Sequence, residues 1–230
     1  MIDYSSYSVK QYKKIYQSTI QFEDFISKYV DLKNKKIIDL GCGGGANTIF
    51  LSKKYPESLF LGLDYQSTLI KYANKKKTKD NVKNCKFKIF DWKNVGGIKN
   101  FDGIVSFQAL SFLDLSYEFA LKKLTKNKFS FLAFSSLFYD GFCNYKIHVD
   151  DFSKSDFSNG YYNIYSLHSI KKVLYKNGYK KFFYEKFNIK IDLPKPNHRG
   201  MGSYTVLNKN NERMIFSGSL YLPYGFILAI

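Results

Sequence analysis

Three alternating glycines near residue 40 follow an apolar run and form the part of the chain best suited to hold a ligand. Residues 37–51 read IIDLGCGGGANTIFL, so Asp39 ends the run and Gly41, Gly43 and Gly45 follow at alternate positions. Glycines let a ligand approach the backbone closely, and the first N–H groups of a following helix point toward it. The GK[ST] ending of a nucleoside-triphosphate loop is missing. The segment therefore predicts a strand, a ligand-binding loop and a helix.

The spacing of the acid and the glycines distinguishes two kinds of nucleoside ligand. A dinucleotide-binding turn has the pattern G-x-G-x-x-G, whereas this loop, with Cys42 inside it, reads D-x-G-x-G-x-G. That pattern strongly resembles the class I, Rossmann-like methyltransferases that depend on S-adenosylmethionine. The carboxylate of Asp39 suits a cationic sulfonium and ammonium and would repel a pyrophosphate. The resemblance covers residues 35–135 and implies S-adenosylmethionine as cofactor, S-adenosylhomocysteine as product and this loop as part of the cofactor site.

A second acid, Asp64, ends the apolar run LFLGLD, 19 residues after Gly45. A carboxylate at the tip of the second strand of a nucleoside-binding unit accepts hydrogen bonds from both ribose hydroxyl groups. The resemblance implies this role for Asp64, with Tyr65 beside it. A helix-capping Asp is the alternative interpretation, and this acid alone does not separate a methyltransferase from a dehydrogenase.

Two further strand ends complete the cofactor site that the resemblance implies. Asp91 would bond the adenine amino group, and Trp92 would bond the ring and cover its face. Ser106, Phe107 and Gln108 follow the fourth predicted strand, where the methyl group meets the acceptor in this family. We expect Ser106 and Gln108 to contact the cofactor and Phe107 to contact the substrate. The [DN]-P-P-Y pattern of amino-methylating DNA enzymes and the Pro-Cys pair of cytosine-carbon enzymes are both missing here.

The acceptor side is less clearly marked. Residues 136–165 are rich in aromatic side chains, and we expect them to form a lid or wall over the substrate with Tyr139 and Tyr145 as contacts. The predicted N-terminal helix would close the other side through Tyr12 and Tyr16. The alternative is that the aromatic side chains of 136–165 only pack a satellite core.

Methyl transfer to an oxygen usually needs a base, and the chain has three histidines, His148, His168 and His198. We favour His148 as the catalytic base, because it lies in the segment after the fifth strand, which often contacts the acceptor in this family. A surface or capping role is the alternative for each histidine.

Strands alternating with helices predict an α/β fold with a doubly wound, mostly parallel, seven-stranded sheet, an antiparallel C-terminal hairpin and a Rossmann-like topology. The predicted strands are 36–40, 59–63, 86–90, 103–107, 129–135, 182–193, 203–207 and 213–216. The predicted helices are 8–30, 48–55, 68–77, about 117–124 and 167–177. We expect one methyltransferase domain over 1–230, divided into a helical cap (1–34), a cofactor-binding core (35–135), a substrate-side insertion (136–165) and a C-terminal helix with antiparallel strands (166–230).

The formal net charge of +17 would suit a nucleic-acid partner, but all except two of the 36 basic residues are lysine. Nucleic-acid surfaces favour the bidentate arginine side chain, so nucleic acid is not the favoured partner and the lysine excess is explained equally well by coding bias. Three cysteines without metal spacing predict free thiols and no metal site. No apolar run reaches the roughly 20 residues of a membrane span, and no signal peptide is recognisable, so we expect a cytoplasmic protein.

The sequence thus predicts an enzyme that transfers a methyl group from S-adenosylmethionine to a small-molecule substrate such as a sugar or nucleotide-linked metabolite. An RNA or protein methyltransferase is the first alternative, and a non-catalytic partner protein with a cofactor fold is the second. The oligomeric state stays open.

Overall fold

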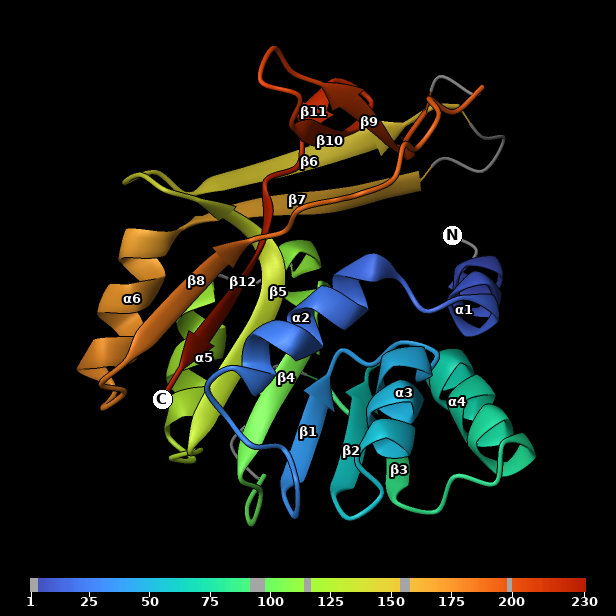
Figure 1. Ribbon diagram of the computed structural model, residues 1–230, viewed down its shortest axis with the longest axis vertical. Coiled ribbons are helices and arrows are strands. Elements are labelled where there is room, and N and C mark those ends of the chain that lie inside the picture. Colours follow the sequence, from blue (N-terminus) through green and yellow to red (C-terminus); the bar gives the residue numbers. More distant parts are fainter. Residues whose placement is uncertain (1–3, 92–97, 114–116, 154–157, 198–199) are drawn as a thin grey trace.

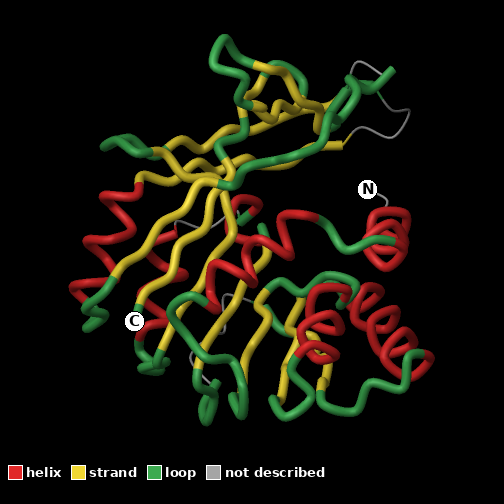
Figure 2. The backbone as a smooth tube through the Cα atoms, in the orientation of Figure 1, coloured by secondary structure: helices red, strands yellow, loops and turns green. Residues whose placement is uncertain are grey.

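The structure is a computed structural model that describes residues 4–91, 98–113, 117–153, 158–197 and 200–230. A central sheet lies between two layers of helices, and a hairpin and a smaller sheet stack beyond one edge of it (Figures 1 and 2). The carboxyl ends of the parallel strands face that edge (Figure 1). Ligands of open α/β sheets bind at the same ends.

The central path of the sheet has the order β3-β2-β1-β4-β5-β12-β8. Its strands are β1 (Lys36–Leu40), β2 (Leu59–Asp64), β3 (Cys85–Ile89), β4 (Gly103–Phe107), β5 (Phe131–Tyr139), β8 (Phe182–Lys186) and β12 (Tyr224–Ala229). The first five strands are parallel, and β12 runs antiparallel between β5 and β8. The predicted seven-stranded, mostly parallel sheet is therefore confirmed.

Helices cover both faces of this sheet because successive strand residues alternate between the faces. The helices are α1 (Tyr4–Lys13), α2 (Gln17–Ser27), α3 (Ala46–Lys54), α4 (Ser67–Lys79), α5 (Tyr117–Thr125) and α6 (Leu167–Lys176), and a 3₁₀ turn, η2, spans Ala109–Phe112. Ile37, Val105 and Ala133 belong to the core under α2, α3 and α4. Ile38 and Ile104, one residue away in each strand, belong to the core under α5, α6 and η2.

Two elements extend the sheet beyond its carboxyl edge. β6 (Tyr145–Asp151) and β7 (Ser158–Ser166) form an antiparallel hairpin, and β7 pairs in parallel with the end of β5. A separate antiparallel sheet contains β9 (Ser203–Leu207), β10 (Arg213–Ser217) and β11 (Leu220–Tyr221). Ile215 and Leu222 join Tyr162 and Ile164 in a third apolar core between the hairpin and this sheet. The predicted hairpin at 203–216 is confirmed, but β12 alone returns to the central sheet.

Two predicted elements are shorter than expected. The helix predicted over 8–30 is two helices, so that Tyr12 contacts the glycine loop while Phe22 packs on the sheet. The strand predicted over 182–193 ends at Lys186, where its partner β12 begins. Beyond that point, the N–H groups of Asn188 and Lys190 donate to glutamine side chains of α2 instead of to a strand.

The helix α2 is joined to α3 through a buried acid. Glu23 is wholly buried and accepts hydrogen bonds from Lys54, Tyr55 and Ser27, the last at 2.7 Å. Burial alone would raise the pKa of Glu23, but these three hydrogen bonds hold it below its usual value. A buried carboxylate that lost a partner would be strongly destabilising, so this cluster fixes where α2 crosses the sheet.

We predict that Tyr55→Phe lowers the free energy of unfolding by about 2 kcal/mol, because it removes a hydrogen bond to a charged group. Chemical denaturation measures the loss. Tyr29→Phe is the matched control, since the Tyr29 ring stacks on Phe183 at 3.9 Å and its hydroxyl makes no hydrogen bond within the described chain. The control should stay within about 0.5 kcal/mol of wild type. Equal losses in the two variants would contradict the role of the Glu23 cluster.

Candidate functional site

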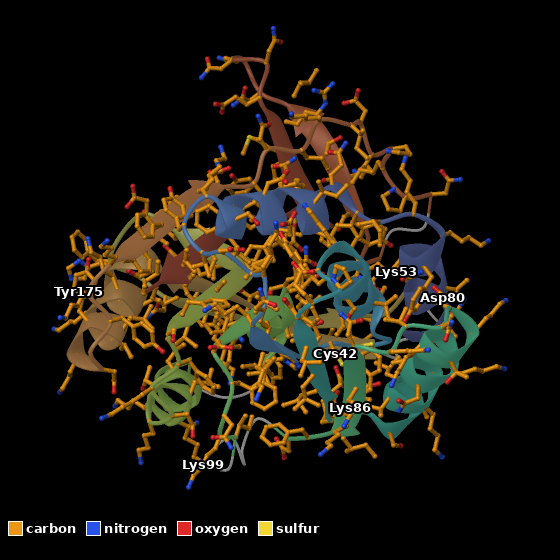
Figure 3. All side chains as sticks on the ribbon, turned by 60° about the horizontal axis from the view of Figure 1, so that its bottom comes forward. Cys42, Lys53, Asp80, Lys86, Lys99 and Tyr175 are labelled. Atoms are coloured by element: carbon orange, nitrogen blue, oxygen red, sulfur yellow. The ribbon has the colours of Figure 1, made fainter. Side chains whose placement is uncertain are left out.

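The loop between β1 and α3 is held by the tip of β2. Gly41, Gly43 and Gly45 have φ angles of 78°, 54° and 83°, in the left-handed region that favours glycine. The carbonyl oxygen of Leu63 accepts the N–H groups of Gly41 (2.8 Å) and Cys42 (3.0 Å). Cys42 lies in the interior (Figure 3), where burial raises the pKa of its thiol well above the usual value. The loop thus crosses the carboxyl ends of β1 and β2.

The glycines of the loop have different surroundings. A Cβ atom on Gly43 would meet no atom within 4 Å, whereas one on Gly45 would lie 2.7 Å from the Phe87 ring and 2.8 Å from Ala73. Gly45 is therefore needed for packing against β3 and α4. Gly43 instead borders open space that a ligand can occupy.

Asp39 lies beneath the loop and is wholly buried. Its Oδ2 accepts a hydrogen bond from the Thr48 hydroxyl at 2.6 Å, and its Oδ1 accepts none from the described residues. Burial raises the pKa of Asp39 to about 7, and the nearby carboxylate of Asp64 raises it further against the effect of Thr48. A buried carboxylate oxygen without a partner suits a cationic group close by.

Asp64, at the tip of β2, reaches back to the loop. Its Oδ2 accepts the N–H of Gly43 at 2.9 Å, and its Oδ1 accepts the N–H of Gln66 at 3.0 Å. Burial raises its pKa, although these two hydrogen bonds and one from the Tyr65 backbone favour the ionised form. Two carboxylate oxygens offer about four acceptor positions, so capacity remains for hydroxyl donors.

Apolar side chains flank this acid on the adjacent strand end. Tyr65 is 64% exposed, and Ile89, which is in register with Asp64 across β2 and β3, is 61% exposed. Large apolar groups exposed beside a polar site are suited to cover a flat ring. Asp91 is exposed two residues after β3, and Trp92 lies outside the described residues. The sequence analysis did not identify Ile89, because an apolar residue at a strand end is expected in the core.

The tip of β4 directs its three predicted residues differently. Ser106 is wholly buried and donates its hydroxyl to the carbonyl of Leu40 at 2.7 Å. The prediction of a cofactor contact is therefore corrected for this side chain, which ties β4 to β1. Phe107 lies on the opposite face, edge-on to Phe22 at 5.1 Å. Gln108 has a φ of 62°, a left-handed conformation that is uncommon for a residue other than glycine and is found at functional sites.

A small cavity of about 20 Å³ lies where the first turns of α2 and α3 meet the tips of β4 and β5. The predicted residues Tyr16, Phe107 and Gln108 all line it. It is also lined by five polar residues that the sequence analysis did not identify, namely Gln11, Ser18, Thr19, Asn47 and Ser135. Asn47 follows the last glycine of the loop by two residues, which is the one signal that could have marked it in advance.

Tyr12 reaches the glycine loop from α1. Its hydroxyl donates to the carbonyl of Gly44 at 2.7 Å, and its ring lies edge-on to Tyr72, with the Lys76 ammonium 4.9 Å from the ring centre. Burial raises the pKa of Tyr12. The residue therefore contacts the loop itself, whereas Tyr16 lines the cavity.

The face of the β6–β7 hairpin that carries His148 is turned toward η2. His148 is opposite Tyr161, two positions along β7 from Asn163, so the three residues share one face. Asn163 on that face donates to the carbonyl of Leu113 at 2.6 Å. The imidazole of His148 stacks on Tyr161 at 5.0 Å, is 48% exposed and lies 3.7 Å from Asp150.

Tyr139 and Tyr145 do not reach the cavity. Their rings contact each other at 5.9 Å, and Tyr139 is in register with Ser166, the residue that caps α6. The prediction that they contact the substrate is corrected, because β5 runs four residues past Ser135 and carries Tyr139 away from the strand tip. His168 contacts Phe142 at 4.9 Å at the same end of the hairpin, and His198 lies outside the described residues.

Within the described ranges, no group of three or more His, Cys, Asp or Glu residues could hold a metal ion. A search of the same residues finds no helix long and apolar enough to cross a membrane. Charged side chains such as Lys53 and Asp80, which form an ion pair at 2.7 Å, lie at the periphery (Figure 3).

We predict that Asp39→Asn stabilises the free protein in a pH-dependent way. The folded protein holds the Asp39 proton up to a pH of about 7, whereas the unfolded chain releases it near 3.8. Wild-type stability should therefore fall as pH rises through this window, and the advantage of the variant should approach roughly 4 kcal/mol above it. Urea unfolding between pH 4 and 8.5 measures the difference, with the exposed Asp24→Asn as control. An advantage that does not vary with pH would contradict the shifted pKa.

Comparison with known proteins identifies the family. The family model described as a methyltransferase domain matches residues 31–186, about two thirds of the chain. The malonyl-[acyl-carrier protein] O-methyltransferase of Bacillus cereus is 28% identical over 110 residues, which are 48% of this chain and 38% of that enzyme. The chain spans less than half the length of the curated relatives that it matches.

Two solved structures share the fold over nearly the whole chain. An S-adenosylmethionine-dependent methyltransferase from Clostridium acetobutylicum aligns with a TM-score of 0.59 and 14% identity, over 99% of this chain and 98% of that one. The N-terminal domain of EvdMO1 with S-adenosylhomocysteine bound aligns with a TM-score of 0.61 and 12% identity, over 93% and 80%. The chain belongs to the methyltransferase domain family, and its identification as a class I, Rossmann-like methyltransferase is confirmed.

Proposed function

We propose that this protein binds S-adenosylmethionine over the glycine loop and transfers its methyl group to a small-molecule acceptor. One arrangement carries the proposal, namely a loop that is open at Gly43 and lies between two buried acids, Asp39 and Asp64. The unpartnered Oδ1 of Asp39 suits a cationic ligand, and the remaining acceptor positions of Asp64 suit ribose hydroxyl groups. The domain of EvdMO1, which shares this fold, holds S-adenosylhomocysteine.

The residues of the chain would act by positioning. S-adenosylmethionine supplies a methyl carbon that is activated by an adjacent sulfonium. Asp64 would orient the ribose, with Tyr65, Ile89 and Asp91 on the adenine side, and Asp39 would favour positive charge near the loop. Tyr12 would close the loop from α1, and Gln108 would border both ligands. Holding the nucleophile, carbon and sulfur in line is the main catalytic requirement, which is catalysis by proximity.

A small-molecule acceptor is favoured over RNA or protein because the cavity beside the β4 tip is enclosed and only about 20 Å³. A cavity of this size admits about one small functional group. A sugar or nucleotide-linked metabolite remains a candidate acceptor. The charge of +17 keeps RNA as the second candidate, and methyl transfer from labelled cofactor to a metabolite pool and to an RNA pool separates the two.

We predict that the protein binds S-adenosylmethionine or S-adenosylhomocysteine with roughly micromolar affinity and that Gly43→Ala weakens binding at least tenfold. The new methyl group would occupy the open side of the loop, at a folding cost of about 1–2 kcal/mol for the left-handed φ. Isothermal titration and thermal unfolding measure the two effects.

Gly45→Ala is the matched control, because its Cβ would strike Phe87 and Ala73. It should lower the melting temperature more than Gly43→Ala does. Tight binding of NAD without binding of S-adenosylmethionine would overturn the cofactor assignment, and binding of neither would favour a non-catalytic partner protein.

A further inference from the structure

We propose that the cavity between α2, α3 and the tips of β4 and β5 binds a carboxylate of the methyl acceptor, so that the product is a methyl ester. The inference rests on the proposed function and narrows its acceptor to molecules that carry a carboxylate. Three properties of the cavity support it: free hydrogen-bond donors at a helix N-terminus, a buried hydroxyl without a partner, and a lining without a base.

The first turn of α2 directs unused donors toward the cavity. Tyr16 precedes the helix without a side-chain cap, and the first turn contains no acid. The N–H groups of Thr19 and Ile20 bond the Tyr16 carbonyl at 3.0 and 3.2 Å. The N–H groups of Gln17 and Ser18 donate to no group in the described chain, and Tyr16 and Ser18 line the cavity. The N-terminus of a helix with free N–H groups favours an anion.

Side chains from three other elements add donors. Ser135 on β5 is 2% exposed, and its hydroxyl has no hydrogen-bond partner among the described residues although it lines the cavity. Asn47 on α3 uses its Oδ1 to accept the Thr19 hydroxyl at 2.9 Å, which leaves its NH₂ group as a donor. The side-chain amide of Gln108 makes no hydrogen bond to the described chain. An ionised carboxylate accepts hydrogen bonds only, so it matches this set.

No Asp, Glu, His, Lys or Arg lines the cavity among the residues that the structure describes. Burial raises the pKa of Tyr16, so its hydroxyl stays protonated at neutral pH and is not a base. A hydroxyl or ammonium acceptor must lose a proton to react, whereas a carboxylic acid with a pKa near 4 is already ionised at neutral pH. The carboxylate oxygen forms the new C–O bond, and the pair of the broken S–C bond stays on sulfur. The negative and positive charges cancel, and no proton moves.

The cavity lies on the acceptor side of the expected cofactor position. Neighbouring strands are about 4.8 Å apart, so β5, which carries Ser135, lies three strand positions or roughly 14 Å from β2, which carries Asp64. S-adenosylmethionine has a carboxylate of its own, however. The experiments below therefore measure the affinities of cofactor and acceptor separately.

The first experiment identifies the bond that is made. The protein is incubated with methyl-labelled S-adenosylmethionine and a panel of small carboxylic acids (succinate, glutarate, benzoate and octanoate), each beside its amide and its alcohol. We expect label only with the acids, in a product that releases volatile methanol in mild base, and a rate that is flat between pH 6 and 9. A base-stable product, or label with the alcohols or amides, would overturn the carboxylate assignment while leaving the proposed cofactor intact. Lack of cofactor binding would instead contradict the proposed function.

The second experiment tests the cavity with the preferred acid of the panel. Asn47→Asp adds a negative charge at an N-terminal helix position that tolerates Asp. We expect at least a tenfold increase in the acceptor KM, and an equal loss of acid binding to the S-adenosylhomocysteine complex by titration calorimetry, with cofactor affinity unchanged. Asn74→Asp, at an exposed position of α4, is the charge control and should behave as wild type. Ser135→Ala should raise KM severalfold without adding charge.

Two results would overturn the assignment of the cavity. If Asn47→Asp weakens cofactor binding and leaves the acceptor KM unchanged, the cavity holds the cofactor's own carboxylate. If His148→Ala lowers turnover and high pH restores it, the acceptor needs a base, which a carboxylate does not. Unchanged turnover in His148→Ala supports the carboxylate.

Discussion

The carbonyl of Leu63 and the carboxylate of Asp64 together take three backbone N–H groups of the glycine loop, from Gly41, Cys42 and Gly43. This constraint sets the shape of the site. Because the donors belong to consecutive residues, the loop cannot move from the tip of β2 without leaving buried polar groups unpaired, which is costly. The position of the loop in turn fixes where α3 begins, and with it the place of Asn47.

The same loop is stabilised from below by packing and from above by α1. Phe87 and Ala73 occupy the space that a side chain at Gly45 would need, and the Tyr12 hydroxyl holds the carbonyl of Gly44. Only the side of Gly43 is left open. The ligand surface is therefore what remains after β2, β3, α4 and α1 have each satisfied the loop elsewhere, which explains why one open glycine borders the site.

Electrostatics divide the site into two halves. Around the loop, Asp39 and Asp64 are buried close together in a chain with a net charge of +17, and burial raises both pKa values. Around the cavity, the groups are neutral donors and a helix N-terminus. A cationic ligand over the first half and an anionic one in the second would each lower the energy of its own half. The opposite charges would also attract each other across the tip of β4.

The sequence by itself determined the fold class, the order of the first five strands and the cofactor side, because these depend on local patterns. A strand ending in Asp39, glycines at alternate positions and an acid after the next strand are read within about 30 residues. The acceptor side was decided by tertiary structure. The cavity joins residues of α2, α3, β4 and β5 that are far apart in the chain, and nothing in the spacing of Ser18, Asn47 and Ser135 indicates that they meet. Ser106 was misplaced because the face of a strand residue depends on its partners, and Tyr139 because the length of β5 is set by its pairing with β7 and β12.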